Sequence, residues 1–364
     1  MTELLSLNAR VAVLGSGSAL PTHRFKTAEL LDRVSAHLSH RQRRRAEKIA
    51  QRLAIHTRYF SRSFALARER PLEGDSAPCL GARALRKAAA ARICDGTTFG
   101  MLIGHTTTPH TLLPSNAAWI AQELEYRGPH MELRQACTGF ATAAALACAL
   151  IGSGVDSVAI VGSEVGSVML DLEQLDADPA QLVNLMQMGD GAGAFILGPL
   201  RSMQQPRLER FFYGSLPGHH LPAISLPQGG SGSPQVETQG ITHFRHDYTA
   251  IREHGTALLE AGLDAARALG IERGSIDWWL PQQVNGRMAE VCARTLGLPP
   301  ERVIVEAGSI GNVGSAATWI ALDRLRRSGR LRGGDRVLVL GAEASKFMYG
   351  GFLYIHADEH KAAA

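Results

Sequence analysis

The chain has 364 residues, of which 45% are hydrophobic and 20% are charged, and its formal net charge at pH 7 is +4. This apolar content is enough for an extensive core, so a globally disordered protein is excluded. The small net charge gives no electrostatic reason to expect nucleic acid as a partner. At this length we expect two domain-sized halves or one large pseudo-symmetric unit.

Five scattered cysteines, at positions 79, 94, 137, 148 and 292, are too few for a disulfide framework. None has the spacing of a zinc ligand, so we expect no metal, and this cysteine usage favours a reducing, cytoplasmic location. The first residues lack the basic start and apolar core of a signal peptide. The longest weakly polar run, residues 140–152, is too short to cross a bilayer, so we expect a buried helix and no membrane partner.

Short β-type runs alternate with helix-type runs along most of the chain. The first strand is predicted at residues 11–15, and a helix begins near Thr27. Later apolar runs predict strands at residues 100–103, 158–161, 194–197, 278–280 and 337–340. Continuous apolar strands separated by amphipathic helices are typical of an α/β protein whose sheets are covered on both faces.

Two segments of the chain repeat each other. The run VDSVAIVGSEVGS, from Val155, resembles GDRVLVLGAEASK, from Gly334. Both copies end their predicted strand on Gly-x-Glu, with Glu164 in the first and Glu343 in the second. An Ala-rich helix with a glycine near its start precedes the strand in both copies. The agreement of helix, strand and terminal glutamate indicates a duplicated α/β unit.

We therefore divide the chain into an N-terminal half, residues 1–200, and a C-terminal half, residues 241–364. The intervening residues 201–240 contain PQGGSGSPQ and are predicted to be a loop that links the halves. A basic run at residues 40–48 is predicted to lie on a helix. It forms either a solvated helix face or an anionic docking patch for coenzyme A or a phosphopantetheine carrier.

Cys137 is the cysteine whose surroundings fit a reaction best. It directly precedes a helix of small residues that starts near Gly139. The positive end of a helix dipole lowers the pKa of a nearby thiol, which would populate the nucleophilic thiolate. On local context alone an inert core cysteine remains the alternative, and this alternative fits Cys148 and Cys292 well.

Several segments are together similar to those of one enzyme family. The run QACTGFATAAALACALIGSG, from Gln135, resembles the active-cysteine segment of β-ketoacyl-acyl-carrier-protein synthase III and its thiolase-superfamily relatives. Further matching segments follow the expected order: GSGSALP, TLLPSNAAWIAQEL, MGDGAGAFIL, WLPQQVNGRM and SIGNVGSAA. The resemblance, from about Val11 to Ala357, implies a thiolase-like, five-layered αβαβα fold with two pseudo-twofold-related halves. It also implies a homodimer, or a hetero-oligomer with another thiolase-fold subunit.

In this family a cysteine takes an acyl group from a thioester, and a histidine and an asparagine act on the second, malonyl-type substrate. By resemblance Cys137 matches the nucleophile and Asn312 matches the asparagine. The histidine position holds Gln282, because the family pattern Pro-His-Gln-Ala-Asn reads Pro-Gln-Gln-Val-Asn here. A glutamine can donate an N–H to a thioester oxygen but cannot exchange a proton near neutral pH. We therefore expect acylation of Cys137 to survive and decarboxylative condensation to be badly impaired.

Three further positions are assigned to substrate binding through the resemblance. Leu113 aligns with a residue that bounds the acyl chain, which indicates an apolar acyl group. Gly311 precedes the aligned asparagine, and Ser345 lies in a loop where the family usually has a glycine triplet. In this loop Glu343 is either a structural counterpart of Glu164 or a replacement acid or base.

A different histidine could supply the missing proton transfer. His105 and His110 lie in a segment that the family places near the acyl pocket. His243, His246 and His254 belong to a segment that resembles the helix near the substrate mouth. Surface-exposed or solvated helix positions are the simpler interpretation of all of them.

Three hypotheses follow. The first is a non-decarboxylative acyltransferase of specialised metabolism, which carries an acyl group on Cys137 from acyl-CoA, acyl carrier protein or another donor to an acceptor. The second is a decarboxylative 3-oxoacyl synthase with a relocated base. The third is a non-catalytic thiolase-fold subunit of a multi-subunit acyltransferase. No cofactor beyond the thioester substrate is expected, and an acyl carrier protein is the expected macromolecular partner besides a thiolase-fold subunit.

Overall fold

The computed structural model describes residues 4–91, 99–175, 178–218, 220–233 and 244–357. Its strands are β1 Leu4–Ala19, β2 His23–Lys26, β3 Thr57–Phe60, β4 Met101–His105, β5 His130–Leu133, β6 Val158–Glu164, β7 Gly191–Gly198, β8 Arg207–Ser215, β9 Ile224–Ser225, β10 Arg245–His246, β11 Trp278–Pro281, β12 Arg336–Glu343 and β13 Met348–Ile355. Its α-helices are α1 Thr27–Arg33, α2 His40–Leu53, α3 Ala77–Ala90, α4 Asn116–Glu123, α5 Gly139–Gly152, α6 Pro179–Gln187, α7 Tyr248–Ala268, α8 Met288–Leu296, α9 Ala307–Ile310 and α10 Ala317–Arg327.

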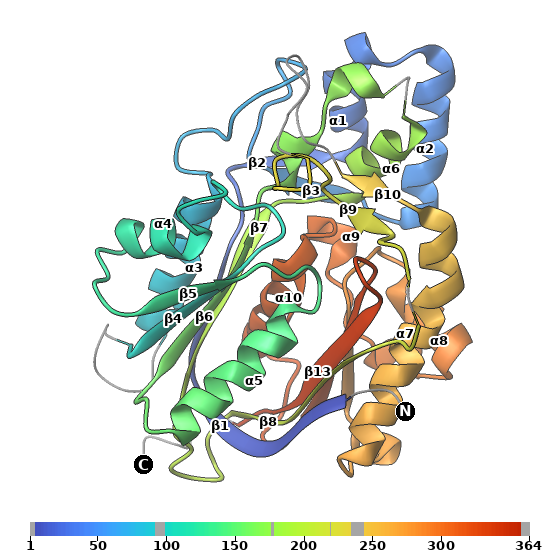
Figure 1. Cartoon of the computed structure of the whole chain (residues 1–364). Helices are drawn as coiled ribbons and strands as arrows, with labels where there is room; N and C mark the ends of the chain where they lie inside the picture. The colour runs from blue at the N-terminus through green and yellow to red at the C-terminus, as the bar shows by residue number, and fades with distance from the viewer. Residues whose placement is uncertain (1–3, 92–98, 176–177, 219, 234–243, 358–364) are drawn as a thin grey trace.

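Nine strands form one hydrogen-bonded sheet in the order β11-β12-β13-β8-β1-β7-β6-β4-β5. Strand β1 joins the two halves of this sheet, since its first part pairs with β8 and its last part with β7. Strands β11 and β12 are parallel to each other, as are β5, β4 and β6, whereas the other neighbouring strands are antiparallel. The sheet folds around α5 and α10, which lie between its two halves (Figure 1).

Helices and sheet halves together make five layers. Helices α5 and α10 pack between the inner faces of the sheet, where Trp319 stacks on Phe352 and meets Phe140 edge-on. Helices α3 and α4 cover the outer face of the N-terminal strands, and α7 and α8 cover that of the C-terminal strands. This arrangement confirms the predicted five-layered α/β architecture. The predicted buried helix at residues 140–152 is α5, whose side chains are mostly small and apolar on all faces of the helix.

The predicted repeat corresponds to two equivalent units, α5–β6 and α10–β12. Glu164 ends β6, and its carboxylate accepts hydrogen bonds from the backbone N–H (3.3 Å) and the hydroxyl of Ser315, just before α10. Glu343 ends β12, and its carboxylate accepts hydrogen bonds from the N–H (2.9 Å) and the hydroxyl (2.6 Å) of Thr138, the N-cap of α5. Each glutamate therefore caps the central helix of the opposite half.

The structure corrects the prediction that residues 201–240 form a loop throughout. Strand β8 lies in this interval and pairs with both β1 and β13. Its neighbouring residues Phe211 and Phe212 point to opposite faces, so one packs with the central helices and the other with the outer layer. The glycine-rich composition of the later residues concealed this short apolar strand. Residues 234–243 lie outside the described part of the chain.

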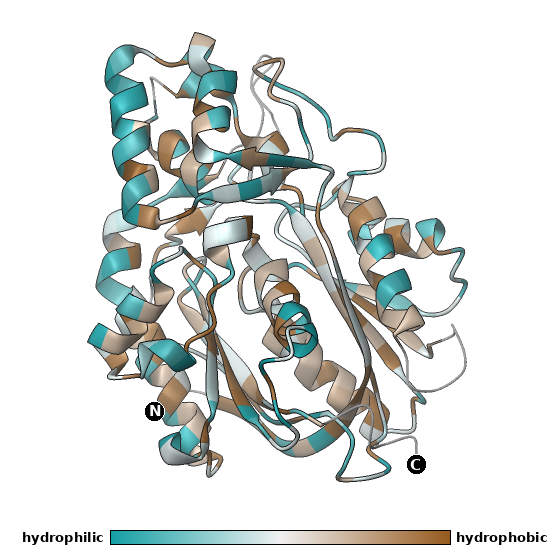
Figure 2. Cartoon of the chain, turned by 180° about the vertical axis from the view of Figure 1, so that it is seen from behind, coloured by the Kyte–Doolittle hydropathy of each residue, from teal (hydrophilic) through white to brown (hydrophobic). Residues whose placement is uncertain are grey.

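A smaller layer of helices α1, α2 and α6 with the β2–β3 ribbon packs at one edge of the molecule around its own apolar cluster. The predicted basic helix is α2, which begins with a capping box between Ser39 and Gln42. Its buried side consists of Ala46 and Ala50, and its hydrophilic side faces outwards (Figure 2). The basic residues are thus exposed, as either interpretation of this run requires.

Candidate active site

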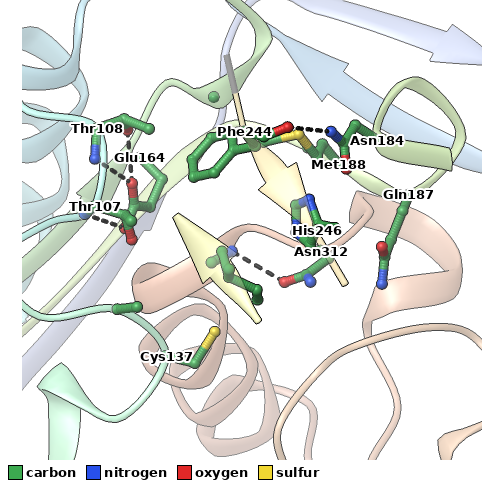
Figure 3. Close-up of a pocket in the computed structure, with 15 residues that line it drawn as sticks. Thr107, Thr108, Cys137, Glu164, Asn184, Gln187, Met188, Phe244, His246 and Asn312 are labelled. Atoms are coloured by element: carbon green, nitrogen blue, oxygen red, sulfur yellow. Dashed lines mark hydrogen bonds between the residues drawn. The ribbon is translucent and has the colours of Figure 1, made fainter. Parts of the chain in front are cut away.

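Cys137 and Asn312 line the same cavity, which has a volume of about 70 Å³ (Figure 3). They come from opposite halves of the chain, Cys137 from the turn before α5 and Asn312 from the turn between α9 and α10. The cavity is lined by Thr107, Thr108, Ala136, Cys137, Glu164, Gly166, Asn184, Gln187, Met188, Gly189, Ile224, Phe244, His246, Asn312 and Gly314. The two residues that the sequence analysis paired are therefore brought together by the fold.

The Cys137 thiol lies in a strongly desolvating and negatively charged environment. Burial and the nearby charges of Glu343 and Glu164 raise the pKa of this thiol well above its usual range. The expectation that the pKa of this thiol is lowered is therefore wrong, because desolvation and the two carboxylates raise it. The thiol is protonated at neutral pH, so it needs a base before it can act as a nucleophile.

Glu164 contributes the negative charge on the cavity wall. Its carboxylate accepts hydrogen bonds from the backbone N–H groups of Thr107 (2.8 Å) and Thr108 (3.0 Å). It also accepts from the hydroxyls of the same two threonines, at 2.9 and 2.6 Å. This acceptor-only pattern is that of an ionised carboxylate, and every one of these donors is neutral. Glu164 is consequently a fixed negative charge whose lone pairs are occupied.

Asn312 is held in place by its backbone and its side chain. Its N–H donates to the carbonyl of Gln187 (2.8 Å), and its Oδ1 accepts from the N–H of Gly314 (3.0 Å). Gly311 precedes it with a φ of 78°, and a Cβ there would lie 2.7 Å from the carbonyl oxygen of Met188. Glycine is therefore required for the two loops to approach each other. In this structure Gly311 supports Asn312, and its predicted contact with substrate stays a prediction.

Gln282 lies directly after β11 and is 1% exposed. Its Nε2 donates to the carbonyl of Gly314 (3.3 Å), and its Oε1 accepts from the hydroxyl of Thr318 (3.4 Å). Among the residues that the structure describes, those that line the cavity do not include Gln282. Its amide thus supports the loop that carries Asn312, and a catalytic role for Gln282 stays a prediction.

A second cavity of about 510 Å³ adjoins the first and shares Thr107, Ala136, Ile224 and Phe244 with it. The predicted substrate-binding residue Ser345 lines this larger cavity, where its hydroxyl donates to Glu343. The remaining wall residues are Thr106, Arg134, Gln135, Tyr213, Ser225, Leu226, Glu343 and Met348.

Leu113 lines neither of these two cavities in the described structure, and it is 88% exposed. Its neighbour Leu112 is 64% exposed. The predicted contact of Leu113 with an acyl chain therefore stays a prediction.

His105 belongs to the core. It is 1% exposed, and its Nε2 accepts a hydrogen bond from the indole N–H of Trp319 (2.9 Å). Burial lowers the pKa of His105 to about 3, so the ring is neutral at neutral pH. Its packing between α10 and the N-terminal strands makes it a structural residue.

His246 is the histidine that reaches the cavity. The sequence analysis assigned it to a helix, but it lies on β10, two residues before α7 begins. Among the described residues it is the only histidine on the cavity wall. His110 and His254 pack against aromatic side chains away from the cavity, and His243 lies outside the described residues.

Other cavity residues were missed because they come from separate elements. Asn184 and Gln187 lie on α6, and Phe244 precedes β10. None of them stands in a motif with a chemical signature of its own. Met188 begins the segment MGDGAGAFIL, which is the one sequence signal that leads to this wall.

The remaining cysteines have structural surroundings. Cys148 on α5 and Cys292 on α8 lie in apolar clusters, which confirms their predicted core positions, and burial raises the pKa of each to about 11. Cys79, at the start of α3, is half-buried, and Cys94 lies outside the described residues. Across the residues that the structure describes, no group of three metal-ligating side chains forms and no helix is long and apolar enough to cross a membrane.

The five layers define a thiolase-like fold, and the comparisons with known proteins place the chain in an acyl-transferring and condensing class. Residues 131–214 match the family model for 3-oxoacyl-[acyl-carrier-protein] synthase III, and residues 266–353 match its C-terminal model. The β-ketoacyl-[acyl-carrier-protein] synthase III of Rhizorhabdus wittichii is 31% identical over 350 residues, which cover 94% of this chain and 98% of the relative. The chain therefore belongs to the β-ketoacyl-acyl-carrier-protein synthase III family.

Other relatives agree with this assignment. The synthase III of Rhizobium meliloti is 29% identical over 94% of this chain and 98% of its own length. Among solved structures, AbyA1, a tetronic acid condensing enzyme, is 26% identical with a TM-score of 0.79 over 95% of this chain and all of that chain. A single-site variant of OleA from Xanthomonas campestris has the same fold at 19% identity, with a TM-score of 0.78 over 96% of this chain and 99% of that chain.

Proposed function

We propose that this protein is an acyltransferase that carries an acyl group on Cys137 and passes it to an acceptor without decarboxylation. The observation that carries this proposal is that Cys137 and Asn312 share one cavity, while the family's histidine position holds the buried amide of Gln282. An amide cannot exchange a proton near neutral pH, which disfavours the family's usual condensation.

The reaction has two halves. In the first, Sγ of Cys137 attacks the thioester carbonyl, the new C–Sγ bond forms, and the donor's thiol departs. In the second, an oxygen, nitrogen or carbon nucleophile attacks the acyl carbon, and the C–Sγ bond breaks. The amide of Asn312 on the cavity wall can donate a hydrogen bond to the carbonyl oxygen as negative charge develops on it.

The partners belong to the proposal as well. We expect a cytoplasmic homodimer, or a hetero-oligomer with a second thiolase-fold subunit, that needs no cofactor beyond its thioester donor. The exposed basic side of α2 favours an acidic acyl carrier protein or coenzyme A as the donor's carrier. Similarity to a tetronic acid condensing enzyme supports a role in specialised metabolism.

Intact-protein mass spectrometry tests this function. The protein is incubated with acetyl-, octanoyl- and malonyl-CoA and with the same acyl groups on an acyl carrier protein. We expect a mass increase equal to one acyl group, which Cys137→Ala abolishes, and peptide mapping distinguishes Cys137 from the half-buried Cys79.

Two other results would contradict the proposal. Release of carbon dioxide from the malonyl donor by the wild-type protein would favour a decarboxylative synthase. A folded wild-type protein that no donor labels would favour a non-catalytic subunit of a multi-subunit acyltransferase.

A further inference from the structure

The protonated thiol of Cys137 requires a proton acceptor, and the family's histidine is absent from its usual position. The other groups near the thiol do not fit this task. Glu164 and Glu343 are each surrounded by hydrogen-bond donors that occupy their lone pairs, and Glu343 does not line the cavity that contains Cys137. The amide of Gln282 is neither an acid nor a base near neutral pH, and His105 is hydrogen-bonded to Trp319 in the core. One titratable side chain on the cavity wall remains, that of His246.

The β9–β10 ribbon carries His246 to the cavity. In its antiparallel register His246 is paired with Ile224, so the two side chains lie on the same face of the ribbon. Both residues line the cavity that contains Cys137 and Asn312. Figure 3 shows the imidazole of His246 beside the Asn312 side chain, on the side of the cavity towards which the Cys137 sulfur points. The cavity is small, so an acyl carbonyl on Sγ would fill much of it.

The residues two positions before and after His246, Phe244 and Tyr248, are held by hydrogen bonds. The carbonyl of Phe244 accepts from Nε2 of Gln181 (2.9 Å) and from Nδ2 of Asn184 (3.3 Å). The hydroxyl of Tyr248 donates to Oδ1 of Asn184 (2.9 Å). The rings of His246 and Tyr248 are stacked, with centroids 5.2 Å apart and planes 9° from parallel. The imidazole is therefore oriented before any ligand binds, as a catalytic group requires.

One ring nitrogen of His246 lacks a partner. Its Nδ1 is buried and has no hydrogen bond to any residue that the structure describes. A buried polar atom without a partner costs free energy, which a bonding partner in the cavity would recover. Burial lowers the pKa of His246 to about 4, while the charge of Asp178 acts in the opposite direction. The ring is consequently neutral at neutral pH but only weakly basic, so it can take the thiol proton only while the new C–S bond forms.

We propose that His246 is the general base and acid that activates Cys137, in place of the histidine missing at position 282. This inference rests on the proposed acyl transfer. A ring nitrogen of His246 takes the proton from Sγ–H as Sγ bonds to the thioester carbon. The C–S bond to the donor then breaks, and the imidazolium returns the proton to the departing thiolate. In the second half-reaction the ring takes a proton from the acceptor and returns it to Sγ.

Single-turnover acylation by 4-nitrophenyl acetate tests this role without depending on the natural donor. The variant His246→Gln keeps a polar side chain but cannot transfer a proton near neutral pH. We expect the rate at which 4-nitrophenolate leaves the ester, as its acetyl group is transferred to Cys137, to fall about 100-fold or more in this variant, the usual contribution of general acid–base catalysis. The matched control is His254→Gln, a histidine outside the cavity that packs against Phe347, which should retain the wild-type rate.

Circular dichroism and the thermal midpoint establish that both variants are folded, and Cys137→Ala defines the background rate. A folded His246→Gln variant with the wild-type rate would overturn the role of His246 and leave the proposed function intact. If 4-nitrophenyl acetate labels Cys137 in a His246-dependent way but no thioester does, the proposed function fails while the activation by His246 stands. A wild-type protein that neither reagent acylates would contradict both.

Discussion

Two buried carboxylates from opposite halves of the chain act on a single thiol. Glu343 caps α5 through Thr138, the residue that follows Cys137, and Glu164 lies on the cavity wall. Both raise the pKa of Cys137, in addition to the effect of burial. Cys137 therefore aligns with the family's nucleophile, but its surroundings keep the thiol protonated until a base removes the proton.

The variant Glu343→Gln should make Cys137 more reactive. It removes one of the two charges, while the amide oxygen can still accept from Thr138 and the amide N–H₂ can donate to Ser345. The pKa of Cys137 should fall, and alkylation by iodoacetamide at pH 8 should accelerate by about tenfold for each unit of decrease.

The exposed substitution Glu260→Gln on α7 is the matched control and should leave the alkylation rate unchanged. Equal rates for Glu343→Gln and the wild-type protein would mean that the charge of Glu343 does not contribute to the pKa of Cys137.

At the scale of elements, a buried aspartate ties α10 to the strand that joins the two sheet halves. Asp323 is 2% exposed and accepts hydrogen bonds from the hydroxyls of Ser16 and Ser18, both at 2.8 Å. It also accepts from Nε of Arg327 (2.9 Å). The two serines belong to GSGSALP, one of the segments that resemble the family, and their hydrogen bonds to Asp323 give this segment a structural role.

Replacement of Asp323 by alanine should lower the free energy of unfolding by about 3 kcal/mol, because three donors lose their buried partner. Urea denaturation monitored by tryptophan fluorescence measures this change. Asp264→Ala removes an exposed pair with Arg267 and should cost less than about 0.5 kcal/mol. Similar losses for the two variants would show that the contact between β1 and α10 adds little to stability.

The whole molecule should lose stability in mild acid, partly through its buried histidines. The pKa of His105 falls from 6.5 to about 3 on folding, so between these values the unfolded chain binds more protons than the native state. The contribution of His105 is complete above pH 6.5 and is lost as the pH decreases towards 3. Asp190 acts in the opposite sense, because burial raises its pKa to about 6.

The variant His105→Gln isolates this effect. It should reduce the slope of unfolding free energy against pH by about 1.4 kcal/mol per pH unit near pH 5, the value for one proton. Urea titrations at pH 5.0, 5.5 and 6.0 give this slope. The slopes of the variant and the wild-type protein can be compared even if their absolute stabilities differ. Replacement of the exposed His110 by glutamine should preserve the wild-type slope, and an unchanged slope in His105→Gln would contradict the assignment.

The sequence by itself determined the α/β class, the repeated unit and the family. Each of these is encoded by neighbouring residues: the small apolar run of α5, the strand that ends at Glu164 and its copy that ends at Glu343, and the order of the motifs. Hydrophobic periodicity and the placement of glycines are patterns among residues close together in the sequence, so they can be recognised without the tertiary structure.

Only the tertiary structure decided the chemistry around Cys137. The sign of its pKa shift depends first on burial and then on Glu343 and Glu164, and the candidate base is His246, which the family resemblance assigned to a helix. Desolvation and charge act through space, and these residues come from strands that are far from Cys137 in the chain. A local pattern can predict a cysteine before a helix, but the electrostatic environment of its thiol depends on which distant residues the fold places beside it.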